Sequence, residues 1–469
     1  MKSEAKPTQE LLHKILSNQS RILSAGADLL LKIGLRGKPF DALAYSEWRG
    51  GLIEKGINPK IHAALYGIYS RVTQFKSGID NSSVQPPKPD RDWVLVVTHD
   101  QSRTGAPILA LSLVNELAKN YNVATVALGS GVLANNFAQA SNAYFKFYGP
   151  RQSSRQFSRF IQKASEFAKF KFAIVNSMEA AFSIESLSYC NIPCIALIHE
   201  YSSYGSRAKG TLEGLKASKA VVFSSSLTRD SMIESRPEIE SQKFFVIPQG
   251  KCEVPQDAQS NQKLISNEKF KESVDSFFNS SNGLNVIGAG YVQYRKGLDL
   301  FVTLASLVTK VPGLEESKFL WVGDGYSTKD ANYGLFVYDQ IARLGLADSI
   351  RIIPSSQYFT YALQRADALA LTSRLDPLPN VVIDAIFEGK HIVCFDKASG
   401  FPELFKDNEV LRSGVAGYLD LEGMARKLTD IGQSLSSSQH RESSAGIAAF
   451  AESNFSFSIY TNRLVNLFD

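Results

Sequence analysis

The sequence predicts an α/β protein with two doubly wound domains, preceded by a helical N-terminal segment. Three observations support this prediction. Short apolar runs alternate with helix-length intervals, which is the pattern of parallel strands joined by helices. The alternation is interrupted by a polar stretch over Cys252 to Gly283 and then resumes. The chain has 469 residues, enough for two large domains.

Residues 1–90 differ from the rest of the chain. Apolar residues recur at helical spacing over 8–35, and a second helical run covers 61–75. Residues 77–90 contain three prolines, which favours a linker. The segment holds 13 basic and eight acidic residues, whereas the remainder is balanced in charge. This excess suits an anionic surface, a solvated helical face or an oligomer contact, and it is too small to predict nucleic-acid binding.

The strands fall into two series, from which we expect three segments: 1–90, a first Rossmann-like domain over 91–260, and a second over 261–469. The last helix is a candidate to cross back onto the first domain. The predicted strands cover 93–98, 122–128, 144–148, 172–176, 194–199, 220–224 and 244–248 in the first series, and 284–290, 318–323, 349–354, 368–372 and 391–395 in the second.

Composition excludes several classes of protein. The hydrophobic fraction is 44% and the charged fraction 21%, as in ordinary globular domains. No apolar run is long enough to span a membrane, and the N-terminus lacks the pattern of a secretory signal. The four cysteines form no C-x-x-C pair, which favours a reducing compartment. We therefore expect a soluble, cytoplasmic protein. No G-x-G-x-x-G follows the first strand, which disfavours a dinucleotide-dependent dehydrogenase.

Candidate binding residues follow the strands, because ligands of doubly wound sheets bind at the carboxyl ends of strands. Residues 98–107 (T-H-D-Q-S-R-T-G-A-P) contain Gly105 and lead into a helix, whose free backbone amides suit an anion. A tight structural turn explains Gly105 equally well. Arg295 and Lys296 precede Gly297 and another helix. Cations at such a turn can reach a phosphate, although a surface basic pair is the simpler explanation.

Residues 373–390 (S-R-L-D-P-L-P-N-V-V-I-D-A-I-F-E-G-K) are the most informative stretch. A helix is predicted to begin near Asn380, so that the amides of Asn380 and Val381 are open to phosphate oxygens. Asp384, inside this helix, can hold a ribose diol, while Asp376 in the loop faces the reacting sugar. The alternative is that both carboxylates are favourable charges near a helix N-terminus.

The order of these motifs resembles that of retaining GT-B glycosyltransferases, most of all glycosyltransferase family four. The matching pieces, over about 92–435, are H-D-x-S-R-T-G-A-P, I-P-C-I-A-L-I-H-E-Y, V-I-P-Q-G, R-K-G-L-D-L-F, F-L-W-V-G-D-G, D-P-L-P-N-V-V-I-D-A-I-F-E-G-K and A-S-G-F-P-E. The resemblance implies two Rossmann-like domains that face a cleft. It also implies a hexosyltransferase that moves a sugar from a nucleoside diphosphate sugar to an acceptor hydroxyl, in glycan, polysaccharide or glycoconjugate synthesis.

The resemblance also assigns roles to residues. The family has two glutamates separated by seven residues, and this sequence has Asp376 and Asp384 at that spacing. Asp376 is then expected at the hydroxyls of the donor sugar and Asp384 at the ribose. Lys296 matches the family's phosphate-binding lysine, whereas the position of the family's arginine holds Tyr291.

The replacement of that arginine makes Arg295 and Arg374 candidates for the missing cation. The resemblance places His199 near the transferred sugar, although histidine is often a satisfied interior residue. The expected catalytic residues are Asp376, Lys296 and His199, and the expected donor contacts are Arg295, Lys296, Asn380, Val381, Asp384, Gly105 and Arg374. In this class fixed cations replace a metal, so no metal or cofactor is expected beside the donor.

The stretch Lys146 to Lys171 has seven basic residues and one acidic residue, interleaved with Phe157, Phe160, Phe167 and Phe170. An amphipathic helix of this kind can meet a membrane surface or an anionic acceptor, such as a lipid-linked or protein-linked glycan. A packed helix with a solvated basic face is equally consistent with the pattern. The expected location is therefore cytoplasmic, with peripheral contact to the inner face of a membrane as an open alternative.

Three other functions stay open at this point. A non-catalytic GT-B protein, either a nucleotide-sugar binder or a partner subunit, is favoured by the two aspartates and by Tyr291. A sugar-nucleotide epimerase shares the architecture and would convert donor without an acceptor. An interaction protein would act through residues 1–90, and activity of a chain that begins near Asp92 would test this. Donor turnover separates the enzymes from the binder.

Overall fold

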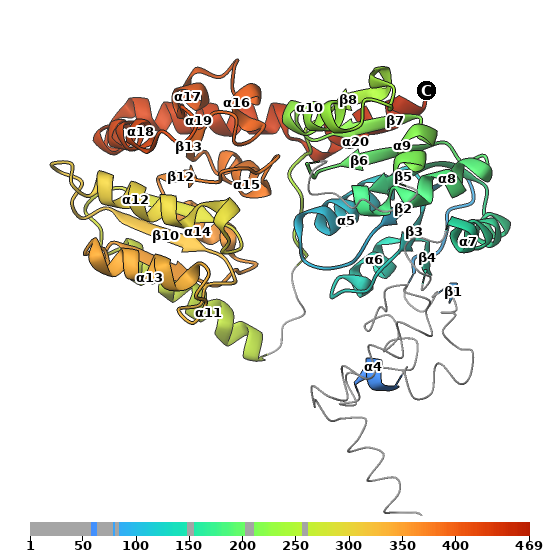
Figure 1. Cartoon of the computed structure of the whole chain (residues 1–469), viewed down its shortest axis with the longest axis horizontal. Coiled ribbons are helices and arrows are strands. Elements are labelled where there is room, and N and C mark those ends of the chain that lie inside the picture. The colour runs from blue at the N-terminus through green and yellow to red at the C-terminus, as the bar shows by residue number, and fades with distance from the viewer. Residues whose placement is uncertain (1–57, 63–77, 80–83, 148–153, 202–210, 256–260) are drawn as a thin grey trace, which may run out of the picture.

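The computed structural model describes residues 58–62, 78–79, 84–147, 154–201, 211–255 and 261–469. Figure 1 shows two α/β domains side by side, each built on its own sheet. This arrangement confirms the predicted fold class of two doubly wound domains. Most of the helical segment predicted over 8–76 lies outside the described residues, which include only the short helix α4 (Pro59–His62) from it.

The first sheet has the order β1-β4-β3-β2-β5-β6-β7-β8 in the described part of the chain. Its parallel strands are β2 (Trp93–Thr98), β3 (Asn122–Ala127), β4 (Ala143–Lys146), β5 (Phe170–Asn176), β6 (Cys194–Ile198), β7 (Ala220–Phe223) and β8 (Phe244–Val246). The edge strand β1 (Gly78–Ile79) pairs antiparallel with β4 and was not predicted. The helices of this domain are α5 (Gly105–Leu117), α6 (Ala134–Ala140), α7 (Ser154–Phe167), α8 (Phe182–Tyr189), α9 (Thr211–Ala217) and α10 (Ser226–Ser235).

The second sheet is parallel throughout, with the order β11-β10-β9-β12-β13-β14. Its strands are β9 (Asn285–Ala289), β10 (Lys318–Val322), β11 (Ile350–Ile353), β12 (Ala368–Leu371), β13 (His391–Phe395) and the unpredicted β14 (Val415–Ala416). The helices are α11 (Asn261–Phe278), α12 (Leu298–Val308), α13 (Gly334–Arg343), α14 (Phe359–Arg365), α15 (Asn380–Phe387), α16 (Phe401–Leu404), α17 (Glu409–Ser413), α18 (Leu421–Ser434), α19 (Ser438–Asn454) and α20 (Phe457–Val465).

Each sheet is buried on both faces. In β2, Leu95 and Val97 belong to one apolar cluster of the first domain, and Val94 and Val96 belong to the other. The second sheet is likewise covered by two clusters. Strands buried on both faces are continuous apolar runs rather than alternating ones, which is why the sequence revealed them.

The polar stretch between the two strand series is largely a helix. α11 directs Phe270, Val274 and Phe277 into the core of the second domain. Its polar residues also hold it in place: Lys271 Nζ lies 4.6 Å from the ring centre of Tyr358, and Arg351 donates a 2.8 Å hydrogen bond to the backbone oxygen of Ser273. The helix therefore docks partly through cation–π and polar contacts.

The basic amphipathic stretch around α7 packs into the first domain. Phe157, Phe160 and Phe170 are buried in the core, whereas Arg159 and Lys163 are exposed. The apolar face of this helix is thus used by the fold. Its basic face and the partly exposed Phe167 at its C-terminal end remain available to a partner.

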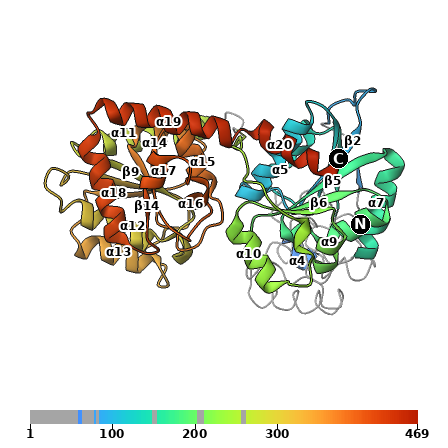
Figure 2. The same cartoon turned by 90° about the horizontal axis from the view of Figure 1, so that it is seen from above.

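The last helices join the two domains. Figure 2 shows α19 along the second domain and α20 beside α5 of the first. Tyr460 and Leu464 of α20 are buried in a core cluster of the first domain, and Phe468 stacks on Phe172 with ring centres 4.3 Å apart. In the described residues, no helix is both long and apolar enough to cross a membrane.

Candidate functional site

A cavity of about 570 Å³ lies between the two domains, where strands of both sheets end. Seven of the nine residues predicted from the sequence line it: Gly105, His199, Lys296, Asp376, Asn380, Val381 and Asp384. Arg295 and Arg374 are not part of the lining. The fold therefore brings together loops that are up to about 280 residues apart in the chain, as expected for the carboxyl ends of parallel strands.

Lys296 reaches the cavity from the loop between β9 and α12. The loop requires glycine at two positions, because Gly290 and Gly297 have φ angles of 141° and 71°. A Cβ atom on Gly290 would lie 3.2 Å from the Cδ atom of Lys296, which is a tight contact. The glycine thus leaves room for the lysine side chain along the loop.

Asp376 is buried in the cavity wall, with 6% of its surface exposed. Its Oδ2 atom pairs with Nζ of Lys296, and its Oδ1 atom lies 3.0 Å from Nη1 of Arg295. The backbone nitrogen of Asp376 donates to the carbonyl oxygen of Ala398 at 2.8 Å. Two cations around one carboxylate leave one net positive charge beside the cavity, and the carboxylate keeps both cations in place.

Two helices direct their N-termini at the cavity. α5 begins at Gly105 and α15 begins at Asn380, and in neither helix does the N-cap side chain accept a hydrogen bond from the first turn. The two ends are close, since a Cβ atom on Gly105 would lie 3.7 Å from Nδ2 of Asn380. Free amides and the positive ends of two helix dipoles make this an anion-binding arrangement.

Asp384 lines the cavity from α15, on the helix whose first turn holds Asn380 and Val381. Burial raises the pKa of its carboxyl group to about 6, while Lys251 opposes this shift and Glu388 adds to it. The carboxyl group is therefore mostly ionised at neutral pH but incompletely compensated. An ionised carboxylate in this position can accept two hydrogen bonds from a diol.

His199 follows β6 and is tied to Asn176 at the end of β5. Nδ2 of Asn176 donates to the carbonyl oxygen of Ala106 at 2.8 Å, so its Oδ1 atom accepts from Nε2 of His199 at 2.9 Å. This arrangement places the imidazole proton on Nε2 and leaves Nδ1 as an acceptor. Burial, with a smaller effect of His99, lowers the pKa of His199 to about 4, so the ring is neutral at physiological pH.

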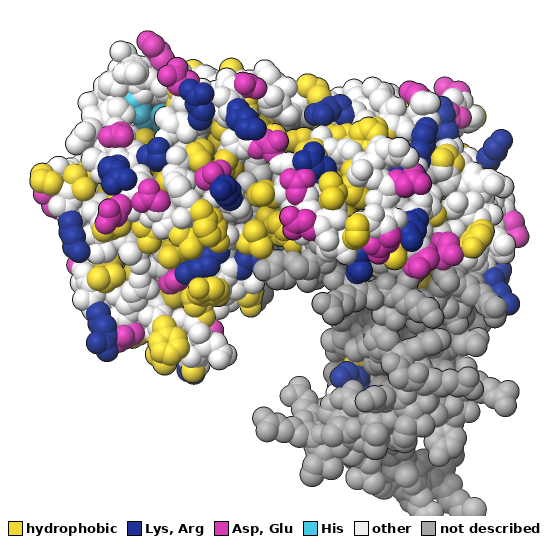
Figure 3. All heavy atoms as spheres, turned by 45° about the horizontal axis from the view of Figure 1, so that its top comes forward, with side chains coloured by type: hydrophobic (Ala, Val, Ile, Leu, Met, Phe, Trp, Pro, Cys, Tyr) yellow, Lys and Arg dark blue, Asp and Glu magenta, His cyan; other side chains and the backbone are white. Residues whose placement is uncertain are grey.

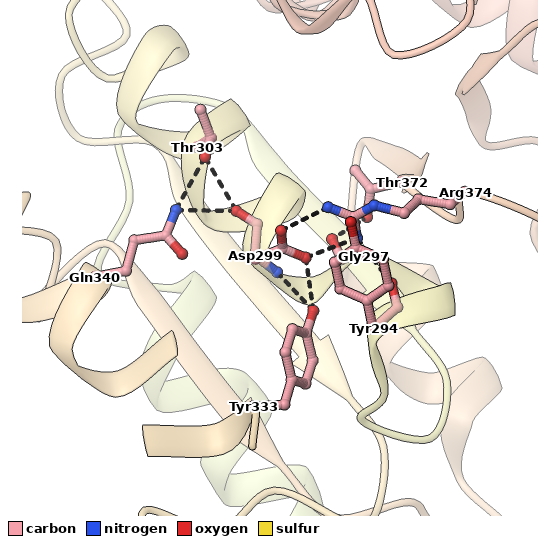
Figure 4. Close-up of polar contacts among 8 residues, drawn as sticks. All are labelled: Tyr294, Gly297, Asp299, Thr303, Tyr333, Gln340, Thr372 and Arg374. Carbon is pink, nitrogen blue, oxygen red and sulfur yellow. Dashed lines mark hydrogen bonds and ion pairs between the residues drawn. The ribbon is translucent and has the colours of Figure 1, made fainter. Parts of the chain in front are cut away.

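Arg374 is held away from the cavity, in the cluster that Figure 4 shows. Its Nη1 and Nη2 atoms donate to Oδ1 and Oδ2 of Asp299 at 2.9 and 2.7 Å, and its guanidinium lies 3.8 Å from the ring centre of Tyr294. Tyr333 donates to Asp299 as well, at 2.7 Å. Arg374, expected to contact the donor, is thus placed outside the cavity lining, and its charge is used by a bidentate pair with Asp299.

Arg295 was expected to contact the donor and was a candidate for the missing cation. It lies next to the cavity rather than in its lining, and it donates to the carbonyl oxygen of Leu375 at 2.7 Å as well as to Asp376. Its closest role is therefore to neutralise and orient Asp376. A third of its side chain, 34%, remains exposed.

Asn176, Ser224 and Gln249 are three of the polar residues of the cavity or its wall that sequence reasoning missed, and Arg103 and Asp324 line the cavity as well. Ser224 and Gln249 line the cavity, and Asn176 orients His199. The sequence did contain a signal for Gln249, because this residue belongs to the V-I-P-Q-G motif at the junction of the domains. For Asn176 and Ser224, the only signal was their position at or just after the end of a strand.

The described residues include no group of three or more His, Cys, Asp or Glu side chains arranged to hold a metal ion. On the face shown in Figure 3, basic and acidic side chains are interspersed among the described residues. This face has no continuous basic stripe of the kind that binds nucleic acid.

Comparisons with known proteins agree with this architecture. The family model for glycosyl transferases group 1 matches residues 271–439. The structure of HepE from Anabaena in complex with UDP is 15% identical, with a TM-score of 0.62 over 80% of this chain and 98% of that chain. A glycosyltransferase from Rickettsia africae is 15% identical, with a TM-score of 0.62 over 81% and 98% of the two chains.

Sucrose-phosphate synthase from Thermosynechococcus elongatus is 14% identical, with a TM-score of 0.58 over 81% of this chain and 98% of that chain. No curated protein sequence matches the chain. The three structures cover both domains described above, and the family model covers most of the second domain. The chain therefore has the GT-B fold of glycosyltransferases, and most of its second domain matches the family model for glycosyl transferases group 1.

Proposed function

We propose that this protein is a retaining glycosyltransferase of the family four type, which transfers a sugar from a nucleoside diphosphate sugar to an acceptor hydroxyl. One observation carries the proposal. One cavity between the domains is lined by Lys296, by the open N-termini of α5 and α15, and by the carboxylates of Asp376 and Asp384. Cation and amides suit the diphosphate, and the carboxylates suit the hydroxyls on either side of it.

The diphosphate is assigned to Lys296 and the amides of Asn380 and Val381. Departure of the leaving group builds negative charge on the diphosphate, and preorganised donors stabilise that charge where it develops. Removing one donor of this kind typically costs about a hundredfold or more in rate. Because Arg374 is paired with Asp299, Lys296 and the two helix N-termini carry most of this task.

Asp376 is assigned two tasks. It pairs with Lys296 and Arg295 and so holds both cations beside the diphosphate. It is also expected to accept hydrogen bonds from hydroxyls of the transferred sugar, as the resemblance implies. Neither Asp376 nor Asp384 is offered as a covalent nucleophile. The leaving phosphate is proposed to accept the proton of the acceptor hydroxyl on the same face of the sugar.

The reaction is proposed to need no metal and no cofactor besides the donor, since fixed cations and amides already face the diphosphate. The acceptor is proposed to be a glycan, free or linked to a lipid or a protein. The protein is proposed to act in the cytoplasm. The exposed basic face of α7, with Arg159 and Lys163, supports electrostatic contact with the inner face of a membrane.

Thermal shift with UDP, GDP, dTDP, ADP and their common sugar conjugates tests the donor site. UDP comes first because the HepE structure was solved with UDP. A ligand at about 100 times its Kd adds about 2.7 kcal/mol of stability, which raises the unfolding midpoint visibly. Lys296→Ala and Asp384→Ala should lose the shift, and Lys310→Ala, at an exposed lysine of the same domain, should keep it.

Absence of any shift with all conjugates would contradict the proposal and favour a degenerate partner subunit. Conversion of the donor sugar without acceptor would instead identify an epimerase. With a donor in hand, the anomeric coupling constant of the product, measured by NMR, tests retention. An inverted product would contradict the assignment to family four.

A further inference from the structure

Three neighbouring strands of the first sheet are followed by side chains that each have one buried polar atom without a partner in the described part of the chain. His199 follows β6, Ser224 follows β7 and Gln249 lies beyond β8, and all three line the cavity. Nδ1 of His199, Oγ of Ser224 and Oε1 of Gln249 are buried and have no hydrogen-bond partner in the described part of the chain. Buried polar atoms are nearly always paired, so three of them in one cavity wall point to a ligand that supplies their partners.

The neighbours of Gln249 fix the orientation of its side-chain amide, and so determine which atom donates and which accepts hydrogen bonds. Its Nε2 atom lies 3.1 Å from the carbonyl oxygen of Leu378 and 2.8 Å from Oδ1 of Asn380. A carbonyl oxygen only accepts, so the amide nitrogen must face Leu378. Oε1 is consequently the atom without a partner, and it can only accept. Gln249 is 7% exposed, so solvent does not satisfy this atom freely.

His199 leads to the same conclusion, because Asn176 leaves its Nδ1 atom as an acceptor. The wall thus presents two acceptors, and a ligand must bring donors to them. Diphosphate oxygens are acceptors and do not fit there, whereas the hydroxyl groups of a sugar do. The first-domain wall is therefore suited to the sugar, and Lys296 with the helix N-termini to the diphosphate.

We propose that Gln249 is a specificity-determining residue of the donor site. Its Oε1 atom accepts a hydrogen bond from a hydroxyl of the transferred sugar, while its Nε2 atom holds the N-terminus of α15 against the first domain. The inference rests on the proposed function, because it takes the ligand to be a nucleoside diphosphate sugar. A site built to bond a hydroxyl discriminates strongly against the analogue that lacks it. The substrate class is thus a hexose with a free hydroxyl at the position facing Gln249.

Two variants separate the hydrogen bond that Oε1 accepts from the sugar from the hydrogen bonds that Nε2 donates at the N-terminus of α15. Gln249→Met removes both the acceptor and the donor at similar size. Gln249→Glu keeps an acceptor oxygen but loses the hydrogen atoms that bond Leu378 and Asn380. The probes are the nucleoside diphosphate hexose selected by the thermal-shift panel, its monodeoxy analogues and the bare nucleoside diphosphate, with Kd measured by calorimetry.

We expect the natural protein to bind one monodeoxy analogue at least about tenfold more weakly than the parent donor. Gln249→Glu should keep this ratio, and Gln249→Met should reduce it to about threefold or less, the range of a single weak hydrogen bond. Both variants should weaken binding of the bare nucleoside diphosphate, because both release α15, and Gln249→Glu should weaken it more, because its carboxylate adds a negative charge beside the diphosphate.

Equal ratios in all three proteins would overturn the assignment of Oε1 to the sugar. Loss of the affinity ratio between parent donor and analogue in both variants would also overturn it. Discrimination would then depend only on the hydrogen bonds from Nε2 of Gln249 to Leu378 and Asn380. If Gln249→Met fails to fold, the affinities of the natural protein still test the proposal. Equal Kd values for the parent donor and all monodeoxy analogues would refute it. Failure of the natural protein to bind any donor would instead refute the proposed function.

Discussion

Replacement of Asp384 by asparagine should stabilise the protein while it impairs donor binding. Burial raises the pKa of this carboxyl group from an ordinary 3.8 to about 6, so folding disfavours its ionised form. A shift of one pKa unit corresponds to about 1.4 kcal/mol, so the full shift corresponds to about 3 kcal/mol. Asp384→Asn removes this penalty, and we expect a gain of up to about 3 kcal/mol in the free energy of unfolding at about pH 7.5.

The pH dependence of this gain has a definite sign. The folded protein holds the proton more tightly than the unfolded chain, so the penalty is absent below the unfolded pKa. It grows as the pH rises from 3.8 to about 6 and is constant above that range. The contributions of His199 and His391 to stability depend on pH in the opposite sense. Burial lowers the pKa of each ring to about 4, so the unfolded chain takes up these protons more readily than the folded protein. Their contribution is lost on acidification in both proteins and cancels in the difference.

Denaturant titrations of both proteins between about pH 4 and pH 8 measure this difference. Asp430→Asn is a matched control, because it makes the same substitution at an exposed position of α18, and surface changes of this kind typically alter stability by about 0.5 kcal/mol or less. A gain that is absent, or constant across this pH range, would refute the assignment of the penalty to Asp384. Affinity for the donor should fall about tenfold or more in the same variant, since hydrogen bonds to charged groups contribute about 1.5–3 kcal/mol.

Three further predictions follow from contacts in the structure. Lys296→Ala should lower kcat about a hundredfold or more in a donor-turnover assay, and near-normal turnover would contradict its phosphate role. Asp299→Asn should lower the free energy of unfolding by about 1–3 kcal/mol because it weakens the bidentate bond to Arg374, and an altered donor Kd would show that this pair serves the donor after all. Asn176→Asp should raise the pKa of His199 and add an acid limb between about pH 5 and pH 7 to kcat/KM, because a protonated ring loses its acceptor; an unchanged pH profile would exclude this role.

The strands were predictable because the two sheets are buried on both faces. β2 occupies the residues predicted from one continuous apolar run, 93–98, and every residue after Trp93 is buried. α11 was not predicted, because much of its docking comes from cation–π and polar contacts such as that of Lys271 with Tyr358. Such contacts depend on partners far along the chain and leave no apolar periodicity. The short strand β14 has only two residues, which is too few for a period.

The individual residues of the candidate site were predictable from the sequence, but the contacts between their side chains were not. Each loop that follows a strand could be recognised from its local sequence, and these loops identified Lys296, Asp376 and Asp384 as candidates. The sequence did not indicate that Arg374 would bond Asp299, because the two residues are 75 positions apart and their distance depends on the fold. Gln249 was missed for the same reason, since its role depends on Leu378 in the other domain.

The charges around Asp376 bear on how the proposed site would hold a diphosphate. Asp376 neutralises one of the two cations beside it, so one net positive charge of this cluster and two helix N-termini would face the diphosphate, and Arg103 adds a cation to the cavity lining. The helix ends are backbone features, and they keep their charge whichever side chains line the loop. Tyr291 at the position of the family's arginine is then compatible with binding, provided that α5 and α15 stay close. Gln249 bonds the first turn of α15 from the first domain, and so couples the approach of the two helices to recognition of the sugar.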